Sequence, residues 1–272
     1  LPVSRELLEE PDDHYLLFAT RLGLIKKTAL SEYVRINRNG KYALRFKKEG
    51  DSLVNVRSAT NEHDIVMIST TGYASRFNCG AIRASGRVSG GVYGIKVSDR
   101  KGSGGGVVAG MVAMLSADEH ILTISKYGMA KRSRLGTAAK VPDTDAAGNP
   151  KFEDDGSPKM ATDGYRRTKP GAKGVRTMKL DEEQDDSIIS VRTIPDIDDH
   201  LFLLTKSGMM IRIRVSQTKE TSGKSTRGTR VMELRDKQKG GFTDEIIFSS
   251  RVSASLLDVD DEDEESPLGE EE

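Results

Sequence analysis

The sequence predicts an all-β fold made of four blade-type repeats of about 50 residues, which form part of a propeller-like array. The first observation is a recurring order of apolar strand, glycine, strand with a basic end, basic loop and further apolar strand. The second is the glycine of the first turn, which recurs at Gly23, Gly72, Gly128 and Gly208. One such unit buries little surface alone, so we expect the core to form between stacked neighbours.

Each unit reads as two hairpins. In the first unit, Tyr15–Thr20 and Leu24–Thr28 flank the tight turn at Gly23, and Tyr42–Phe46 and Leu53–Val56 make the second pair. Apolar and β-branched residues alternate with small or polar ones, which is typical of half-buried strands. Glycine at the turn adopts a positive φ without steric cost.

The second and fourth units repeat this order without interruption. In the second, IVMIST and YASRF form the first hairpin, and VYGIKV is predicted to pair with VVAGMVAM. In the fourth, LFLLT and MMIRI are followed by TRVMEL and EIIFSSRV. We place the β-domain at residues 1–254, with blades at about 12–58, 62–115, 118–195 and 198–253.

The third unit is interrupted at Gly136–Gly164 by a stretch rich in Asp, Gly, Pro and Ala. With so little apolar bulk, this stretch is predicted to be a disordered or loosely held surface insertion. The unit resumes at YRRTKPGAKGVRTMKL and ends with SIISVRTI.

Composition excludes several classes of protein. Trp is absent and aromatic residues make up 5%, which disfavours a stacking platform for single-stranded nucleic acid. The single cysteine, Cys79, excludes an internal disulfide framework and a cysteine-rich zinc site. No apolar run is long enough to span a membrane, and no signal peptide is visible. We expect a cytoplasmic protein, and, because the chain begins at Leu1 in a linker-like segment, a fragment of a longer one.

The net charge of zero hides two regions of opposite sign. Asp258–Glu272 holds ten acidic residues and no base, so the preceding 257 residues carry 42 bases against 32 acids. We predict a disordered acidic tail at 255–272 beside a basic body. The tail is either a solubilising segment or an internal mimic of DNA that competes for the same cations.

Basic residues recur at two positions of the repeat. The fourth residue after the turn glycine is always basic, and we call Lys27, Arg76, Arg132 and Arg212 the strand cations. The loop before the second glycine is also basic in every unit. Equivalent repeat positions occupy equivalent places in the array, so we expect these groups to form a solvent-facing stripe. A scattered charged surface is the alternative, since 31% of all residues are charged.

No catalytic arrangement is apparent. His14, His63, His120 and His200 occupy the same slot on different units, where they cannot converge on one metal ion. Cys79 has no neighbouring base that would activate it. The run GSGGG lacks the lysine and helix of a phosphate-binding loop. We therefore predict no catalytic residue, no metal site and no cofactor in this chain.

The basic stripe suits the phosphates of duplex DNA. Lys and Arg on a curved β surface contact the backbone without reading bases, so binding depends on salt and on duplex bending. The predicted DNA contacts are Lys26, Lys27, Arg35, Arg38, Arg76, Arg83, Arg87, Lys131, Arg132, Arg134, Arg166, Arg167, Lys169, Lys173, Arg176, Arg212, Arg214, Lys219, Lys224, Arg227 and Arg230.

Five segments resemble the C-terminal domain family of bacterial DNA gyrase A and of the related topoisomerase IV. They are Ala19–Tyr33, Ser85–Val97, Ile121–Ser133, Lys169–Leu180 and Leu201–Gln217. The resemblance implies a β-pinwheel, of which these units are the last four of six blades. It also implies a non-catalytic module that wraps double-stranded DNA and presents it to the cleavage gate.

The same resemblance implies partners and cofactors outside this chain. The partners are the rest of gyrase A and the ATPase protein gyrase B, in a heterotetrameric holoenzyme that uses ATP and Mg on other domains. The basic box that distinguishes gyrase lies in the family's first blade, and no such string occurs here. Relaxation and decatenation by topoisomerase IV therefore stays an alternative to supercoiling, as does a protein-interaction propeller.

Overall fold

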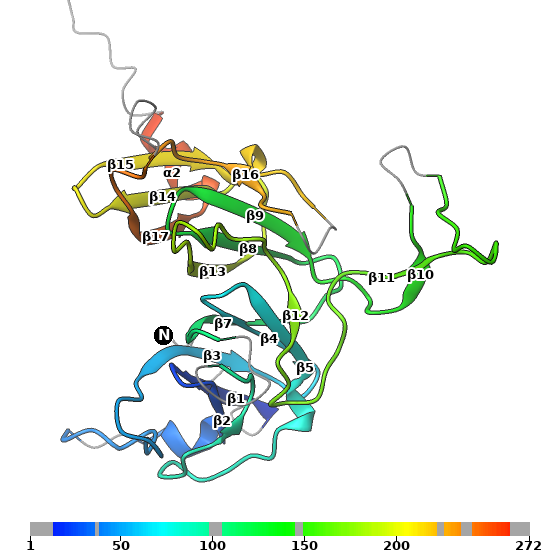
Figure 1. Cartoon of the computed structure of the whole chain (residues 1–272). Coiled ribbons are helices and arrows are strands. Elements are labelled where there is room, and N and C mark those ends of the chain that lie inside the picture. The colour runs from blue at the N-terminus through cyan, green and yellow to red at the C-terminus, as the bar shows by residue number, and fades with distance from the viewer. Residues whose placement is uncertain are drawn as a thin grey trace, which may run out of the picture.

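A computed structural model describes residues 13–35, 38–97, 105–144, 149–221, 226–234 and 241–261, the last four without their side chains. Four antiparallel sheets follow one another along the chain as blades, which confirms the predicted all-β repeat fold (Figure 1). Lys224 and the acidic residues from 262 onward lie outside the described residues. No helix in the described ranges is long and apolar enough to cross a membrane.

Each blade is built on a central hairpin closed by the turn glycine. In all four hairpins the two strands pair in a regular antiparallel register, and the predicted first hairpin of every unit is confirmed. The hairpins are β1 (Tyr15–Thr20) with β2 (Leu24–Ala29), β4 (Asp64–Ser69) with β5 (Tyr73–Asn78), β8 (His120–Ser125) with β9 (Met129–Arg134), and β14 (His200–Thr205) with β15 (Met210–Arg214).

A third strand from the end of each unit pairs with the first strand of the hairpin. These third strands pack against one another from blade to blade and line the inner side of the array. They are β3 (Leu53–Ala59), β7 (Val108–Met114), β13 (Ile188–Ile194) and β17 (Ile246–Val252).

The fourth strand of a blade comes from the following unit. It pairs with the basic-ended strand of the preceding hairpin, so that β6 pairs with β2, β12 with β5 and β16 with β9. These exchanged strands are β6 (Val92–Tyr93), β12 (Val175–Arg176) and β16 (Thr229–Arg230). Among the described residues, β15 has β14 as its only partner strand, so the last sheet has three strands.

The predicted second hairpin within each unit is therefore wrong. VYGIKV does not pair with VVAGMVAM but crosses to the preceding blade, and Tyr42–Phe46 forms no strand at all. An alternating pattern shows that a segment is a strand, but it does not specify the partner. Tyr42, at the position equivalent to Tyr93 of β6, is 85% exposed.

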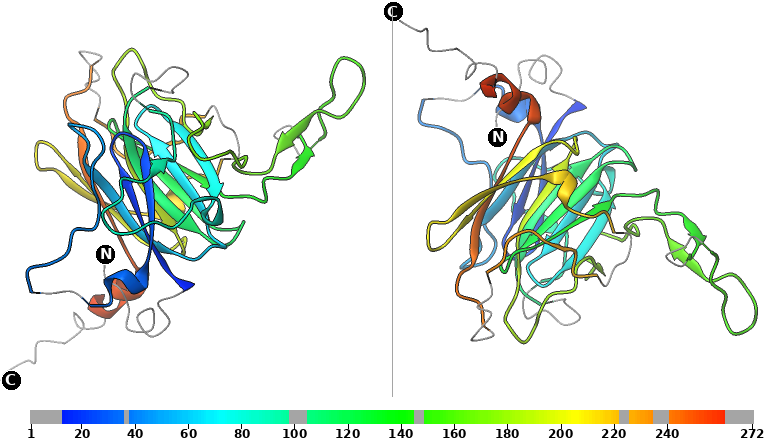
Figure 2. Two further views of the ribbon diagram at one scale, coloured as in Figure 1. Left: turned by 90° about the horizontal axis from the view of Figure 1, so that it is seen from below. Right: turned by 90° about the horizontal axis from the view of Figure 1, so that it is seen from above.

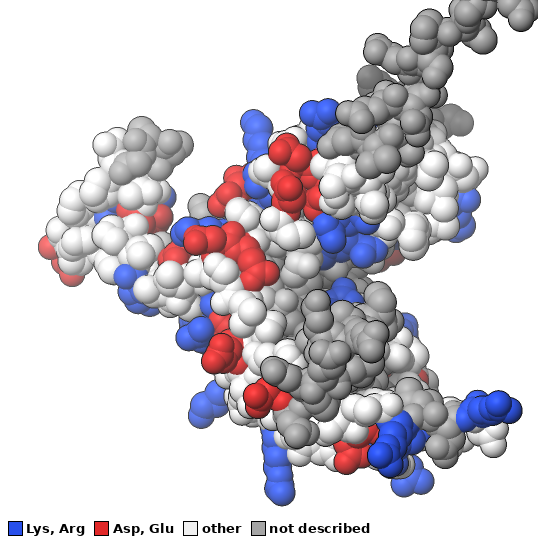
Figure 3. All heavy atoms as spheres, turned by 180° about the vertical axis from the view of Figure 1, so that it is seen from behind, with Lys and Arg blue, Asp and Glu red and all other residues white. Residues whose placement is uncertain are grey.

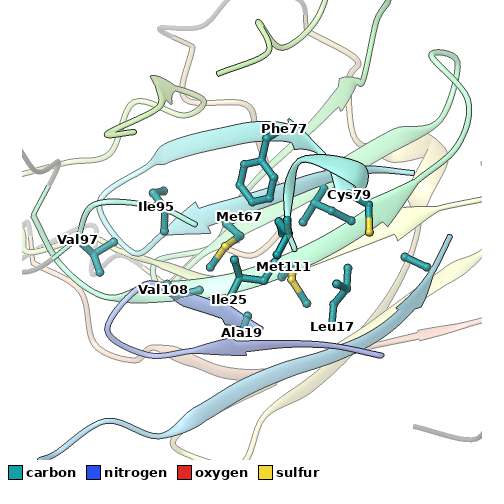
Figure 4. Packing of buried hydrophobic residues seen from close by; sticks show 13 residues of the cluster. Leu17, Ala19, Ile25, Met67, Phe77, Cys79, Ile95, Val97, Val108 and Met111 are labelled. Carbon is teal, nitrogen blue, oxygen red and sulfur yellow. The ribbon is translucent and has the colours of Figure 1, made fainter. Parts of the chain in front are cut away.

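The hydrophobic core lies in the seams between blades, as predicted for stacked units. Along β4, Ile65 and Met67 face the first blade, while Val66 and Ile68 face the third. A third cluster joins the last two blades around Leu122. Figure 4 shows Met67, Phe77 and Met111 packed against Leu17 and Ile25 of the first blade. The central hairpins of the second and third blades thus each contribute to two seams, and each seam needs both of its blades.

The glycine of the first turn is also part of a seam. Gly23 has φ +88°, and a Cβ added there would lie 2.3 Å from the carbonyl oxygen of Ile95 in the exchanged segment. The carbonyl of Gly23 in turn accepts a hydrogen bond from the amide of Gly94. The repeat glycine is needed for the turn and for this close approach of the next unit.

The insertion at Gly136–Gly164 lies at the surface, as the sequence predicts, and it contains a short antiparallel strand pair that the sequence did not indicate. Where it is described, it forms an arm around β10 (Lys140–Pro142) and β11 (Met160–Thr162), which projects away from the blades (Figures 1 and 2). Asp163 fixes its base by accepting hydrogen bonds at 2.8 Å from the amide and hydroxyl of Thr137 and from Arg134. These bonds hold the pKa of Asp163 below its usual value. The amide of Thr137 contributes most, followed by the hydroxyl of Thr137 and then Arg134.

Short helices complete the fold. In three units a 3₁₀ turn follows the hairpin: η2 (Leu30–Tyr33), η3 (Cys79–Ala81) and η4 (Val215–Gln217). In the third unit the arm takes this place, directly after Leu135. Helix α2 (Ala254–Asp261) follows β17, so the start of the region predicted to be a disordered tail is helical.

Candidate nucleic-acid interface

Two of the four strand cations, Lys27 and Arg76, are buried, so the expectation that all four face solvent is wrong. Lys27 is 3% exposed and lies over the ring of Tyr15, with its Nζ 4.1 Å from the ring centroid. Its Nζ donates to the carbonyl of Cys79 in the second unit at 3.2 Å and to the side chain of Asn61, which lies just before that unit. Lys27 therefore joins the first blade to the second and cannot reach a phosphate.

Arg76 performs the same role between the second and third blades. It is 2% exposed, and its Nε donates to Asp64 at 2.9 Å. Its Nη1 donates to the carbonyls of Leu135, Gly136 and Tyr165 at 2.8 to 2.9 Å. A single guanidinium thus satisfies three backbone oxygens at the base of the arm. Removing one member of such a buried network leaves the others unpaired, which is strongly destabilising.

The other two strand cations are more open. Arg132 is half-buried, and its Nε donates to the carbonyl of Thr218 in the fourth unit at 3.3 Å. Arg212 is exposed, because no blade covers that face of β15 in the described chain. The strand cations are thus seam residues wherever a following blade is present.

Lys26 and Lys131, one position earlier in the repeat, are also corrected. They are 1% and 2% exposed, and each donates from Nζ to backbone carbonyls, Lys26 to Ala43 at 2.6 Å and to Arg87, and Lys131 to Thr177. Burial lowers the pKa of each to about 8, because the charged ammonium is poorly solvated there. Both amines are enclosed by backbone carbonyls and cannot reach DNA.

The loop cations, by contrast, are at the surface. Each loop crosses the preceding blade at the strand cation: the amides of Ser85, Thr168 and Thr221 donate to the carbonyls of Lys27, Arg76 and Arg132. Two residues before these amides stand Arg83, Arg166 and Lys219, all exposed. Of the predicted contacts, the exposed ones are Arg35, Arg38, Arg83, Arg134, Arg166, Arg167, Lys169, Lys173, Arg212, Arg214, Lys219, Arg227 and Arg230, and the half-buried ones are Arg87, Arg132 and Arg176.

Ion pairs divide the exposed set further. Arg167 pairs with Asp64 at 3.0 Å, and Arg134 pairs with Asp118 and Asp163. Other pairs hold Arg87, Arg176, Arg227 and Arg230 to Glu32, Glu182, Asp181 and Glu233. Among the described residues, no ion pair involves Arg83, Arg166, Lys169, Lys173 or Lys219, and the same holds for Arg35, Arg38, Arg212 and Arg214. The first five lie on loops that cross to a preceding blade, and we call them the free loop cations; one of them, Lys173, also lies over the ring of Tyr73.

Sequence reasoning missed one basic segment. Lys41, Arg45, Lys47 and Lys48 follow the first loop, and the last three are exposed. The Nζ of Lys47 donates to the carbonyl of Gly91 at 2.6 Å, which places it beside the loop of the second unit. The run KYALRFKKEG is visible in the sequence, but its residues were assigned to a hairpin and not to the surface.

The described residues show no arrangement suited to covalent chemistry. A cavity of about 330 Å³ lies at the base of the arm, where His120 contacts Glu220 at 2.8 Å and Lys131 and Tyr165 form part of the wall. Burial raises the pKa of the Cys79 thiol, so this cysteine is a poor nucleophile. No group of three or more His, Cys, Asp or Glu among the described residues could hold a metal ion.

The chain matches the family model described as the DNA gyrase C-terminal domain, a β-propeller, over residues 14–60, 63–103, 159–195 and 199–239. These matched segments correspond to the four units, and most of the arm falls between them. The chain belongs to this family.

Individual gyrase proteins agree with this assignment. The chain is 30% identical over 256 residues to the DNA gyrase A protein of Staphylococcus aureus, covering 94% of this chain and 24% of that protein. It is also 30% identical to the DNA gyrase A protein of Staphylococcus epidermidis, covering 84% of this chain and 22% of that protein. The chain thus spans about a quarter of the length of these gyrase A proteins.

Solved structures share the fold. A C-terminal domain of DNA topoisomerase IV superposes with a TM-score of 0.66 and 20% identity, covering 93% of this chain and 68% of that one. A DNA gyrase A C-terminal domain gives a TM-score of 0.63 and 19% identity, covering 88% of this chain and 66% of that one. Both likenesses support the β-pinwheel architecture.

Proposed function

We propose that this chain is a non-catalytic module that binds and wraps duplex DNA for a type IIA topoisomerase of the gyrase kind. The observation that carries this proposal is the set of free loop cations: Arg83, Arg166 and Lys219 recur at one repeat position on three successive crossing loops. They are exposed and have no carboxylate partner among the described residues. A duplex that follows these loops meets a new cation at every blade.

The chemistry of this surface favours contact with phosphates over reading of bases. Lys and Arg on loops of different blades meet the backbone at intervals set by the blade spacing, and this fixes the path of the duplex without selecting a sequence. Binding then depends on counterion release, and preference among sequences comes from how easily each one bends. The buried seam lysines and arginines keep the blades in register, and the loops make the contacts.

The wider setting is also part of the proposal. The rest of a gyrase A protein and the ATPase protein gyrase B would supply the DNA gate, ATP and Mg, and this module would hold the segment that they act on. The gyrase assignment is favoured over topoisomerase IV because the curated relatives at 30% identity are DNA gyrase A proteins. The arm, whose base is bonded to Arg76, would stand beside the wrapped duplex and would not be needed for wrapping.

Duplex binding measured across a salt series tests the proposal. If about six to eight phosphates are neutralised, the slope of log affinity against log salt is roughly −5 to −7. Arg166→Ala and Lys219→Ala should each weaken binding to all sequences and reduce the slope by about one. Arg134→Ala is the matched control, because this arginine already pairs with two carboxylates. A slope near −1, or preference for one short sequence, contradicts the proposal.

A further inference from the structure

The inner side of the array brings together strands from different blades. Strands β3, β7, β13 and β17 pack successively, and β7 lies between β3 and β13. A Cβ added at Gly110 of β7 would lie 2.8 Å from Cβ of Val191 in β13 and 3.5 Å from Oδ1 of Asn55 in β3. Gly110 therefore lets β3, β7 and β13 approach one another closely, with Asn55 of β3 and Val191 of β13 on either side of it.

Three arginines lie on these inner strands: Arg57 on β3, Arg192 on β13 and Arg251 on β17. Arg192 donates from Nε to the hydroxyl of Ser249 at 3.3 Å and also to the carbonyl of Ser249, so its head group is fixed against β17. Arg251 pairs with the buried carboxylate of Asp199. Arg57 bonds to the carbonyl of Val56 at 3.0 Å, beside a hollow of about 250 Å³ along β3.

Two of these arginines carry charge that no acid balances. Within the described ranges, neither Arg57 nor Arg192 contacts a carboxylate, although both are half-buried. Burial lowers the pKa of both groups, and the charges of Arg57 and Arg251 lower that of Arg192 further. Figure 3 shows Lys and Arg atoms in the hollow between the two halves of the molecule. Partly desolvated like charges raise the free energy of the folded chain unless an anion joins them.

We propose that Arg57 and Arg192, with Arg251 beside them, form an anion site on the inner side of the array that takes an oxyanion, either a phosphate or a carboxylate. A guanidinium presents a planar fork of donors that fits such an oxyanion with two parallel hydrogen bonds. Arg57 uses one hydrogen bond to its neighbour and Arg192 is held by Ser249, so both retain further donors. The site is separate from the crossing loops proposed to contact DNA.

The sequence provides one internal source of carboxylates. Strand β17, which carries Arg251, leads through α2 into the acidic run that ends at Glu272. Eleven residues follow Asp261, and a chain of that length can extend roughly 35–40 Å. The oxyanion can therefore be a free phosphate or a carboxylate of this run, and the experiment must separate the two.

Thermal unfolding in inorganic phosphate, against chloride at matched ionic strength, tests the site. The chain ending at Asp261 should show a saturable rise in melting temperature with phosphate, and Arg57→Gln or Arg192→Gln should lose the saturable part. Arg227→Gln, on a crossing loop, is the control that keeps it. If phosphate raises the melting temperature of the full chain less than that of the chain ending at Asp261, the acidic run occupies the site. If the two rises are equal, the occupant is free phosphate. Both outcomes support the site.

Two further measurements distinguish the site from a structural role. Arg57→Gln in chloride should melt at the same temperature or higher, since it removes an unbalanced charge, whereas loss of a structural arginine lowers it. Arg57→Lys keeps the charge but loses the fork, so it should bind phosphate several-fold more weakly. Duplex binding should be unchanged in Arg57→Gln. The proposal is overturned if phosphate raises the melting temperature no more than chloride does, or if the rise persists in both Arg57→Gln and Arg192→Gln. Either outcome leaves the proposed DNA binding untouched.

Discussion

Arg76 and Arg212 occupy the same position of the repeat, yet one is 2% exposed and the other is exposed. Arg76 bonds to Asp64 and to three carbonyls of the third unit, because the third blade covers that face of β5. No described blade covers β15, and Met210 in the same strand is 63% exposed. The comparison teaches that the role of a repeat residue depends on the following blade and not on its own unit.

The largest difference is expected between two substitutions at this position. Arg76→Ala should lower the free energy of unfolding by about 3–5 kcal/mol, since it leaves a buried carboxylate and three carbonyls unpaired. Arg212→Ala should change it by less than about 0.5 kcal/mol. Urea unfolding of the two variants checks this. Equal effects would show that the seam at Arg76 contributes no more than an exposed surface.

The turn glycines sharpen the same contrast. A Cβ at Gly72 would lie 2.6 Å from the carbonyl oxygen of Met178, whereas nothing lies within 4 Å of a Cβ at Gly208. Both have a positive φ, which costs an alanine roughly 1–2 kcal/mol. Gly72→Ala should lower the free energy of unfolding by roughly 1–3 kcal/mol more than Gly208→Ala does, because the segment that carries Met178 must also move. Calorimetric melting of both variants measures the difference, and a matching loss would exclude close packing at Gly72.

Lys131 and Ile211 form a third matched pair, since they are equivalent in the repeat and only Lys131 carries an ionisable group. Lys131 is 2% exposed, and Ile211 is half-buried against the third cluster. Burial lowers the pKa of Lys131 from 10.5 to about 8. Between these values the unfolded chain binds one more proton at this amine than the folded chain, so stability rises with pH.

The rise due to Lys131 is at most roughly 3 kcal/mol between pH 8 and 10.5. It should disappear in Lys131→Met and remain in Lys219→Met, where the lysine is exposed. Urea unfolding at a series of pH values gives the slopes. An identical slope in wild type and Lys131→Met would mean that the buried amine does not titrate in this window.

The smallest effect is expected for the arm. Replacing residues 137–163 with a short glycine–serine link keeps Leu135, Gly136 and Tyr165, which supply the carbonyls that Arg76 binds. The apolar side chains of the arm, such as Phe152 at 62% exposure, are not part of a seam. Unfolding should stay cooperative, and stability should change by less than about 1 kcal/mol, because loop closure depends weakly on length. A broad or biphasic transition would show that the arm supports the blades.

The sequence by itself determined the period, the central hairpins, the turn glycines and the basic loops with their exposed cations. All of these depend on local chemistry: alternating side chains favour a strand, a positive φ favours glycine, and a polar loop stays at the surface. Arg83, Arg166 and Lys219 could be assigned correctly to the surface because their loop cannot be buried in a seam of apolar residues.

Only the tertiary structure decided which strand pairs with which and which cations are buried. Val92–Tyr93 carries the same alternating pattern whether it pairs within its own unit or with β2, so the exchange was not visible. Lys27 and Arg76 look like surface residues in the sequence, because a charge is buried only when another part of the chain supplies its hydrogen-bond partners. The carbonyls of Cys79 and Leu135, which these two side chains bind, belong to the following unit and lie more than 50 residues away, so local sequence does not record them.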